Sequence, residues 1–205
     1  MSENRMAFNM TQNFSDIILH LYRKYSETAT WIKLLPYRLF GLKVGSRPNF
    51  AQGICFSKLY LKNITIGNNV SLGERGYVLI LQKQGRICIG DGTYICDDFF
   101  ISSHAPVSIG KNCLFSFKVT ILGHSHPVGW GVNPVTSGYE ECAPTSIGEG
   151  CFIGCYAIIM PGVRLGDYCV VGANSVVTKS FPAGSVIAGN PASLMRSMPG
   201  KNMPN

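Results

Sequence analysis

The chain repeats itself every six residues between Ile147 and Pro182. In register the segment reads IGEGCF, IGCYAI, IMPGVR, LGDYCV, VGANSV and VTKSFP. Each unit opens with an aliphatic residue, and four of the six place glycine next. A six-residue period fits neither an amphipathic helix nor a single alternating strand. It is typical of a solenoid in which each unit forms one side of a coil and three units close the coil.

The same register extends toward the N-terminus. Counted from Ile66, the hexads number fourteen, and their phase breaks at residues 78–88, 107–108 and 127–146. The first residue of each hexad, which we call the opener, is expected to point into a continuous core where coils stack. We therefore predict an all-β solenoid over residues 61–192, with an N-terminal helical and basic segment (1–60) and a C-terminal tail (193–205).

The eight cysteines fit the core of such a solenoid. Cys113, Cys151 and Cys169 fall at the fifth position of their hexads, where a small inward side chain is wanted. No CxxC pair occurs, and a free cysteine packs as a small hydrophobic residue. We expect these three thiols to fill the core, and we expect neither a disulfide framework nor a structural zinc site.

The composition and charge of the chain limit the cellular compartment and the partners that we expect for the protein. Hydrophobic residues make up 46% of the chain and charged residues 14%, and no run of 18 apolar residues occurs. The N-terminus lacks the charged-then-apolar layout of a signal peptide. We therefore expect a cytoplasmic protein. Residues 1–62 carry nine basic against three acidic side chains, whereas the rest is nearly neutral.

The basic N-terminal segment has helical periodicity. Apolar residues between Phe14 and Tyr25 recur on one helical face, and a second apolar stretch runs from Trp31 to Phe40. Pro36 is expected to bend or end this second helix. One interpretation is a helix that caps the open end of the solenoid. The alternative is a basic amphipathic surface in peripheral contact with the inner face of the membrane. Nucleic acid is disfavoured, because the basic residues are interleaved with apolar ones.

A histidine pair marks the candidate site. His124 and His126 end one hexad, directly before the 127–146 excursion, which is rich in glycine and proline. Long excursions from a regular scaffold are commonly functional loops. Histidine is the side chain best suited to proton transfer near neutral pH. His104 lies where the register breaks upstream.

Taken together, these motifs resemble a known family. The hexads, the His126-Pro127 pair, and an ending that runs from Val176-Val177-Thr178-Lys179 to Ala188-Gly189-Asn190-Pro191-Ala192 resemble the hexapeptide-repeat acyltransferases. Within them the chain is similar to the O-acetyltransferases of sugars and bacterial surface polysaccharides. The resemblance implies a left-handed parallel β-helix, a homotrimer, and acetyl-CoA bound in clefts between neighbouring coils.

The resemblance also implies roles for particular residues. His126 corresponds to the family's catalytic base, with His124 as the alternative. The family's acetyl-CoA contacts fall on Cys155, Ala173, Thr178, Lys179 and Arg196. The implied reaction is transfer of acetyl from acetyl-CoA to a hydroxyl of a sugar or polysaccharide precursor, by direct attack on the thioester. It requires no metal.

Three other classes of function stay open at this point. The same fold could acetylate the nitrogen of an amino sugar or the hydroxyl of an antibiotic. A zinc hydratase of the trimeric carbonic-anhydrase kind would need three histidines, for which His104, His124 and His126 are the candidates. A scaffold protein without catalysis is the non-enzymatic alternative.

Overall fold

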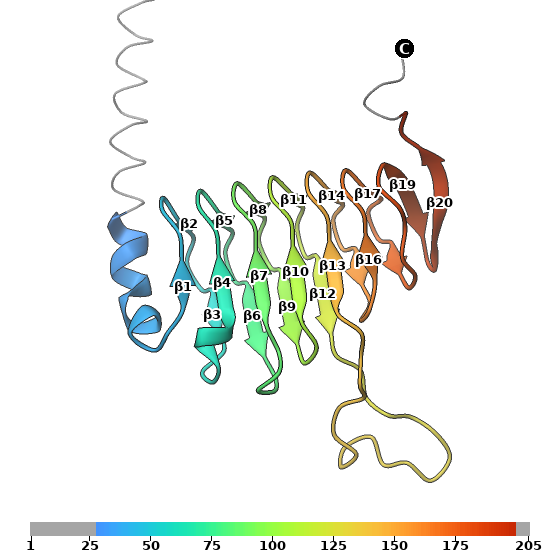
Figure 1. Ribbon diagram of the computed structural model, residues 1–205, viewed down its shortest axis with the longest axis horizontal. Coiled ribbons are helices and arrows are strands. Elements are labelled where there is room, and N and C mark those ends of the chain that lie inside the picture. Colours follow the sequence, from blue (N-terminus) through green and yellow to red (C-terminus); the bar gives the residue numbers. More distant parts are fainter. Residues whose placement is uncertain (1–27, 200–205) are drawn as a thin grey trace, which may run out of the picture.

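The computed structural model describes residues 28–199 and shows a three-sided solenoid (Figure 1). The chain visits three sheets in turn, and each passage adds one short strand to each sheet. Sheet A contains β1 (Lys43–Val44), β4 (Ile64–Ile66), β7 (Ile87–Ile89), β10 (Val107–Ile109), β13 (Thr145–Ile147) and β16 (Arg164–Leu165). Sheet B contains β2 (Asn49–Phe50), β5 (Ser71–Leu72), β8 (Tyr94–Ile95), β11 (Leu114–Phe115), β14 (Phe152–Ile153), β17 (Val170–Val171), β19 (Ser185–Gly189) and β20 (Ala192–Ser197). Sheet C contains β3 (Cys55–Phe56), β6 (Tyr77–Ile80), β9 (Phe100–Ser103), β12 (Thr120–Gly123), β15 (Ile158–Ile159) and β18 (Val176–Val177).

Neighbouring strands in each sheet run parallel and come from successive coils. The exception is the last pair, β19 and β20, which is antiparallel and lies at the C-terminal end of sheet B (Figure 1). Because each coil donates backbone hydrogen bonds to the next, the strands need only two to four residues to be held in place. The predicted β-solenoid is confirmed.

The core of the solenoid follows the predicted hexad positions. Openers such as Ile153, Ile159 and Val171 are completely buried. The fifth positions also point inward, and Cys113, Cys151 and Cys169 are at most 2% exposed. All eight cysteines are free thiols. The prediction that these three cysteines fill the core is therefore confirmed.

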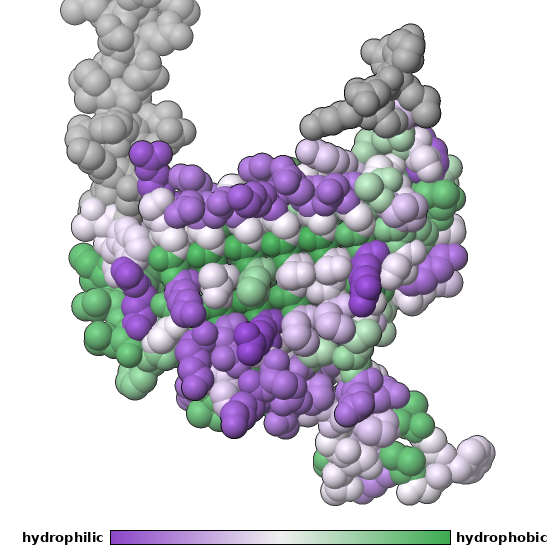
Figure 2. Space-filling view, viewed as in Figure 1, coloured by the Kyte–Doolittle hydropathy of each residue, from purple (hydrophilic) through white to green (hydrophobic). Residues whose placement is uncertain are grey.

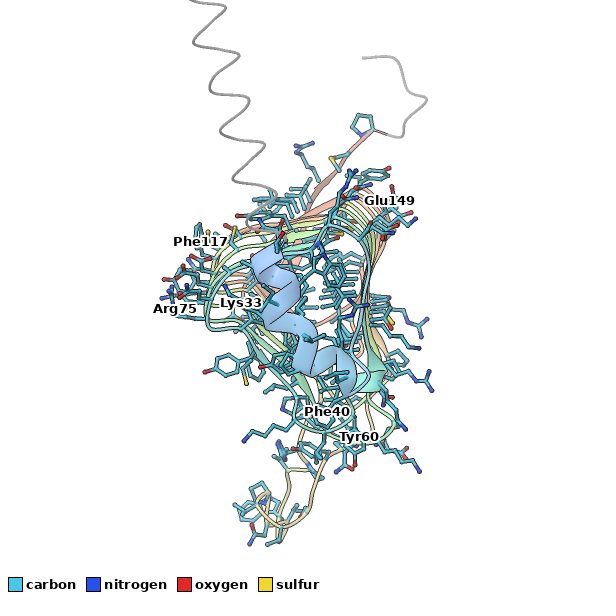
Figure 3. All side chains as sticks on the ribbon, turned by 90° about the vertical axis from the view of Figure 1, so that its left-hand side faces the viewer. Lys33, Phe40, Tyr60, Arg75, Phe117 and Glu149 are labelled. Carbon is cyan, nitrogen blue, oxygen red and sulfur yellow. The ribbon has the colours of Figure 1, made fainter. Side chains whose placement is uncertain are left out.

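The three corners of the coil are not alike. Corner AB, between sheets A and B, and corner BC, between sheets B and C, each place one residue with a positive φ at the same point of successive coils. At corner AB these residues are Asn69, Gly92, Asn112, Gly150 and Tyr168. At corner BC they are Arg75, Asp98, Lys118, Tyr156 and Asn174. In the end-on view, Glu149 marks corner AB, and Arg75 and Phe117 mark corner BC (Figure 3).

Corner CA, between sheets C and A, varies in length from coil to coil. Its connections cover residues 57–63, 81–86, 104–106, 124–144 and 160–163, and the first includes the 3-10 helix η1 (Leu61–Asn63). Every phase break in the hexad register is therefore absorbed at this one corner. The largest connection projects from the body of the solenoid as a long loop (Figure 1).

A helix over residues 28–39 covers the N-terminal end of the solenoid (Figures 1 and 3). Its side chains Thr30 and Leu34 are buried against the first coil, and Thr30 Oγ1 accepts a hydrogen bond from the Phe50 amide at 3.3 Å. The Tyr37 ring packs against Phe56 with centroids 5.2 Å apart. The helix does not end at Pro36, contrary to one of the two outcomes expected for that residue. Proline removes one backbone hydrogen bond and crowds the carbonyl four residues before it, but here the helix continues for three residues beyond Pro36 before it ends in a turn at Phe40.

The boundaries of the solenoid differ from the prediction. The first coil begins at β1 rather than at residue 61, and its Phe50 and Phe56 fill the inward positions that Leu72 and Val78 hold in the next coil. At the other end, β20 continues to Ser197, so the segment after 192 is in part a strand. Thr145 and Ser146 belong to β13 and not to the excursion. The helix predicted around residues 14–25 lies outside the described residues. Within 28–199, no helix has the length and apolar content that crossing a membrane would require.

Candidate active site

The candidate site lies at corner CA, where the chain leaves β12. Gly123, the last residue of β12, is paired with Ser103 of β9, so the position of the following residues is fixed by a rigid strand. His124 and His126 come next, and the long loop departs from Pro127. The backbone returns at Glu140, whose amide donates to the Ser125 carbonyl at 2.9 Å. The base of the loop is thus fastened beside the histidines.

His126 is exposed, and one of its ring nitrogens is held by the loop. Its Nδ1 lies 2.9 Å from the carbonyl oxygen of Gly138. A carbonyl oxygen can only accept, so Nδ1 carries the proton in this bond. In the neutral imidazole, Nε2 is then the basic nitrogen, and it is available to take a proton.

His124 has a different environment, closer to the coil. Its Nδ1 lies 2.8 Å from Ser102 Oγ, and its ring is only partly exposed. Burial lowers the pKa of His124, and the neighbouring His126 and His104 lower it further. The neutral form of His124 is therefore favoured next to His126.

Tyr139 joins the three histidines into one cluster, which we call the His–Tyr cluster (His104, His124, His126 and Tyr139). Its ring centroid lies 5.0 Å from that of His126, 5.2 Å from that of His104 and 5.7 Å from that of His124. The rings of His124 and His126 are perpendicular, with centroids 5.8 Å apart. The side chain of Tyr139, in the segment of the loop that returns to the solenoid, therefore packs against all three histidines.

Sequence reasoning missed three members of this environment. Tyr139 was hidden in the excursion, and Ser102 looked like an ordinary strand residue. Gln84, whose amide Nε2 donates to Nε2 of His104 at 2.8 Å, belongs to the 81–86 connection. The feature that could have pointed to these residues is their position, since all of them lie at or beside corner CA. In the described part of the chain, no three His, Cys, Asp or Glu side chains are grouped as metal ligands would be.

Two of the five implied donor contacts share this corner. Thr178 and Lys179 directly follow β18, which lies two strands beyond β12 in sheet C. Both side chains are exposed, and Lys179 Nζ lies 5.7 Å from the centroid of the Phe181 ring. A cation and a hydroxyl on neighbouring residues could bind phosphate oxygens.

Two further implied contacts lie together at corner BC. The Cys155 carbonyl accepts a hydrogen bond from Asn174, the residue after Ala173, at 2.8 Å. Cys155 Sγ lies 2.8 Å from Ser116 Oγ, and this hydrogen bond lowers the pKa of the thiol. The structure thus brings Cys155 close to Ala173, while the width of sheet C separates this pair from Thr178 and Lys179.

Arg196 is apart from the other candidates. It is exposed on β20, where it pairs with Val186 of β19 at the edge of sheet B. Within the described residues, its β20 strand pairs with β19 of sheet B, away from the other candidates at corners BC and CA. Its implied role in donor binding stays a prediction.

Comparison with known proteins identifies the family. The family of bacterial transferase hexapeptide repeats (six repeats) matches residues 144–179. A Dictyostelium discoideum protein named as an acetyltransferase is 37% identical over 153 residues, which cover 71% of this chain and 77% of the relative. Escherichia coli WbbJ, named as a lipopolysaccharide biosynthesis O-acetyl transferase, is 33% identical over 67% of this chain and 74% of its own length.

The solved structures agree with the sequence relatives. Galactoside acetyltransferase, solved in complex with coenzyme A, is 30% identical and superposes with a TM-score of 0.56, covering 72% of this chain and 65% of its own. The hexads match a repeat family, and the sequence similarity spans most of the solenoid and most of the relatives. The chain therefore belongs to the hexapeptide-repeat acetyltransferases.

Proposed function

We propose that this protein transfers the acetyl group of acetyl-CoA to a hydroxyl of a sugar or surface-polysaccharide precursor, with His126 as general base. The observation that supports this role is the hydrogen bond from His126 Nδ1 to the Gly138 carbonyl. It directs the basic Nε2 away from the loop and fixes the orientation of the ring. His124 is the weaker candidate, because its ring is partly buried and held against Ser102.

The reaction can be written with few participants. Nε2 of His126 removes the proton of the acceptor hydroxyl while the oxygen attacks the thioester carbonyl carbon. The carbon–sulfur bond then breaks, and the imidazolium returns the proton to the departing thiolate. General base catalysis of this kind contributes roughly 10²–10⁴-fold. No cysteine is required as a nucleophile, which agrees with the burial of Cys113, Cys151 and Cys169.

The donor is inferred to lie across sheet C at its C-terminal strands. Thr178 and Lys179 stand on one border of this sheet, and Cys155 and Ala173 on the other. The chain from Ser175 to Thr178, which includes β18, alone spans about 10 Å, so only a long, extended ligand could touch both borders. Coenzyme A has that shape, and a relative of 30% identity has been solved with it.

A second copy of the chain is proposed to complete the site. His126 and Lys179 are both exposed among the residues 28–199 of the single chain. Acyl transfer benefits from exclusion of water, since hydrolysis of the thioester competes with transfer. A homotrimer would place the neighbouring chain's surface against sheet C and close the cleft over donor and acceptor.

The nature of the product tests the proposal. The protein would be incubated with acetyl-CoA and with galactosides, glucosides or amino sugars, and release of the CoA thiol would be followed. We expect acceptor-dependent thiol release and a product whose acetyl group is an ester, cleaved by neutral hydroxylamine. An amide product, formed only with amino sugars, would contradict O-acetylation. Thiol release that no saccharide accelerates would contradict the sugar acceptor.

A further inference from the structure

The capping helix has a second apolar face that the solenoid does not cover. While Thr30 and Leu34 are buried against the first coil, four large apolar side chains point away from it. These residues, which we call the end patch, are Ile32, Leu35, Leu39 and Phe40, with exposed fractions of 69%, 58%, 79% and 76%. Apolar side chains that gather in this way on a soluble domain mark an interaction surface.

The end patch is surrounded by positive charge. Residues 28–73 contain six basic side chains and no aspartate or glutamate. All six are exposed, and they are Lys33, Arg38, Lys43, Arg47, Lys58 and Lys62. Two belong to the helix and four to the first coil, so they stand around the rim of the same end of the solenoid. Within residues 28–73, every charged side chain is therefore basic.

The patch lies on the end of the molecule and not on a side. Figure 3 looks directly onto this end and shows Lys33 on the helix that crosses it and Phe40 just beyond the end of that helix. In Figure 2, hydrophobic surface gathers at the same end, below the grey segment. The proposed donor and acceptor residues lie on later coils, so a surface could approach this end without covering them.

We propose that the N-terminal end of the solenoid docks onto a lipid surface that carries anionic headgroups. Large apolar side chains at the centre of a basic rim are suited to insertion at the headgroup boundary, with the cations over acidic lipid. The absence of any acidic residue in 28–73 removes the repulsion that such a surface would otherwise feel. A basic or uncharged protein partner would gain no electrostatic attraction from these basic side chains.

Docking through the N-terminal end would fix the distance between the lipid surface and the candidate active site. β12 lies three strands beyond β3 in sheet C, and strands are spaced by about 4.8 Å, so His126 would stand roughly 15 Å above the first coil. A saccharide attached to a lipid carrier could reach that height with its outer sugars. This consequence rests on the proposed function, whereas the docking itself does not.

Vesicle flotation with the full-length protein tests the docking. Vesicles of phosphatidylcholine alone would be compared with vesicles that also contain about 30% phosphatidylglycerol. We expect at least tenfold more protein bound to the anionic vesicles, and less at high salt. The double variant Leu35→Glu, Leu39→Glu should lose at least tenfold in binding. The matched control, Leu194→Glu with Met195→Glu at the opposite end (51% and 66% exposed), should bind as the unchanged protein does.

Several results would overturn the proposal. One is equal flotation of the end-patch variant and the unchanged protein, and another is no preference for anionic vesicles. A change in the solution mass of the end-patch variant without lipid would identify the patch as a protein interface. Thermal unfolding checks that the variants are folded. If the end-patch variant is not, Lys33→Glu with Lys62→Glu gives the same test through charge, and unchanged binding of that variant would refute the docking.

Discussion

Corners AB and BC of the solenoid repeat from coil to coil, whereas corner CA does not. At the regular corners a residue of positive φ recurs in the same place, and successive backbones approach closely. At corner CA the connection shortens to residues 104–106 or lengthens to residues 124–144. The hydrogen bonds and buried openers of the sheets do not depend on these connections. Corners AB and BC therefore maintain the coil, while corner CA is free to vary, which suits the catalytic role proposed for it.

A substitution at a regular corner is expected to have the largest effect on stability. A Cβ added at Gly110 would lie 2.5 Å from the Gly148 backbone of the next coil, so the coils would have to separate. We expect Gly110→Ala to lower the free energy of unfolding by about 3 kcal/mol, measured by denaturant titration. Gly129→Ala in the long loop is the matched control, because its Cβ meets only Val132 at 3.6 Å.

The control should change stability by less than about 0.5 kcal/mol. If Gly110→Ala and Gly129→Ala were equally harmless, the regular corners would not be the part that holds the coils together. If both were equally damaging, the long loop would contribute to the fold as much as the corners do.

A second test concerns how corner CA positions His126. Tyr139 packs on all three histidines, so Tyr139→Ala should loosen the base of the loop and lower kcat about tenfold. Tyr139→Phe keeps the ring and should stay within about twofold of the unchanged protein. Steady-state kinetics with saturating acetyl-CoA measure both. Equal rates for Tyr139→Ala and Tyr139→Phe would show that the ring does not position the base.

A third test separates donor binding from catalysis at the same corner. Lys179→Ala removes the cation expected to meet the donor's phosphates, so KM for acetyl-CoA should rise about fivefold with little change in kcat. Lys83→Ala is the control, since Lys83 is an exposed lysine at corner CA on the other side of the histidines. A fall in kcat without a change in KM would remove Lys179 from the donor site.

The smallest expected effect is a pH dependence of stability. The pKa of His124 is lowered in the folded protein, so the unfolded chain binds the proton more readily. Stability from this residue is therefore present above its ordinary pKa, about 6.5, and is lost as the pH falls below that value. Thermal unfolding at pH 7 and pH 5 should show a smaller loss for His124→Asn than for the unchanged protein. An identical loss would mean that His124 is not the group responsible.

The core of the regular coils could be predicted from the sequence, whereas the arrangement at corner CA could not. Openers such as Ile153 and fifth positions such as Cys169 could be predicted, because burial in a coil follows from local sequence period. The first coil was not predicted, since the connection at 57–63 puts its inward Phe50 and Phe56 out of phase with the register that begins at Ile66. The packing of Tyr139 could not be predicted, because it depends on the path by which a long loop returns across corner CA. No sequence period encodes that path.

The most direct test of the account is the rate of acetyl transfer by His126→Ala beside that of His124→Ala. Because His126 is exposed and its Nδ1 is held by Gly138, we expect His126→Ala to lower kcat at least a hundredfold. Its affinity for acetyl-CoA and its thermal stability should be unchanged, and His124→Ala should lose less than about tenfold. Full activity in His126→Ala would contradict the assignment of the general base, and with it the claim that the irregular corner carries the chemistry.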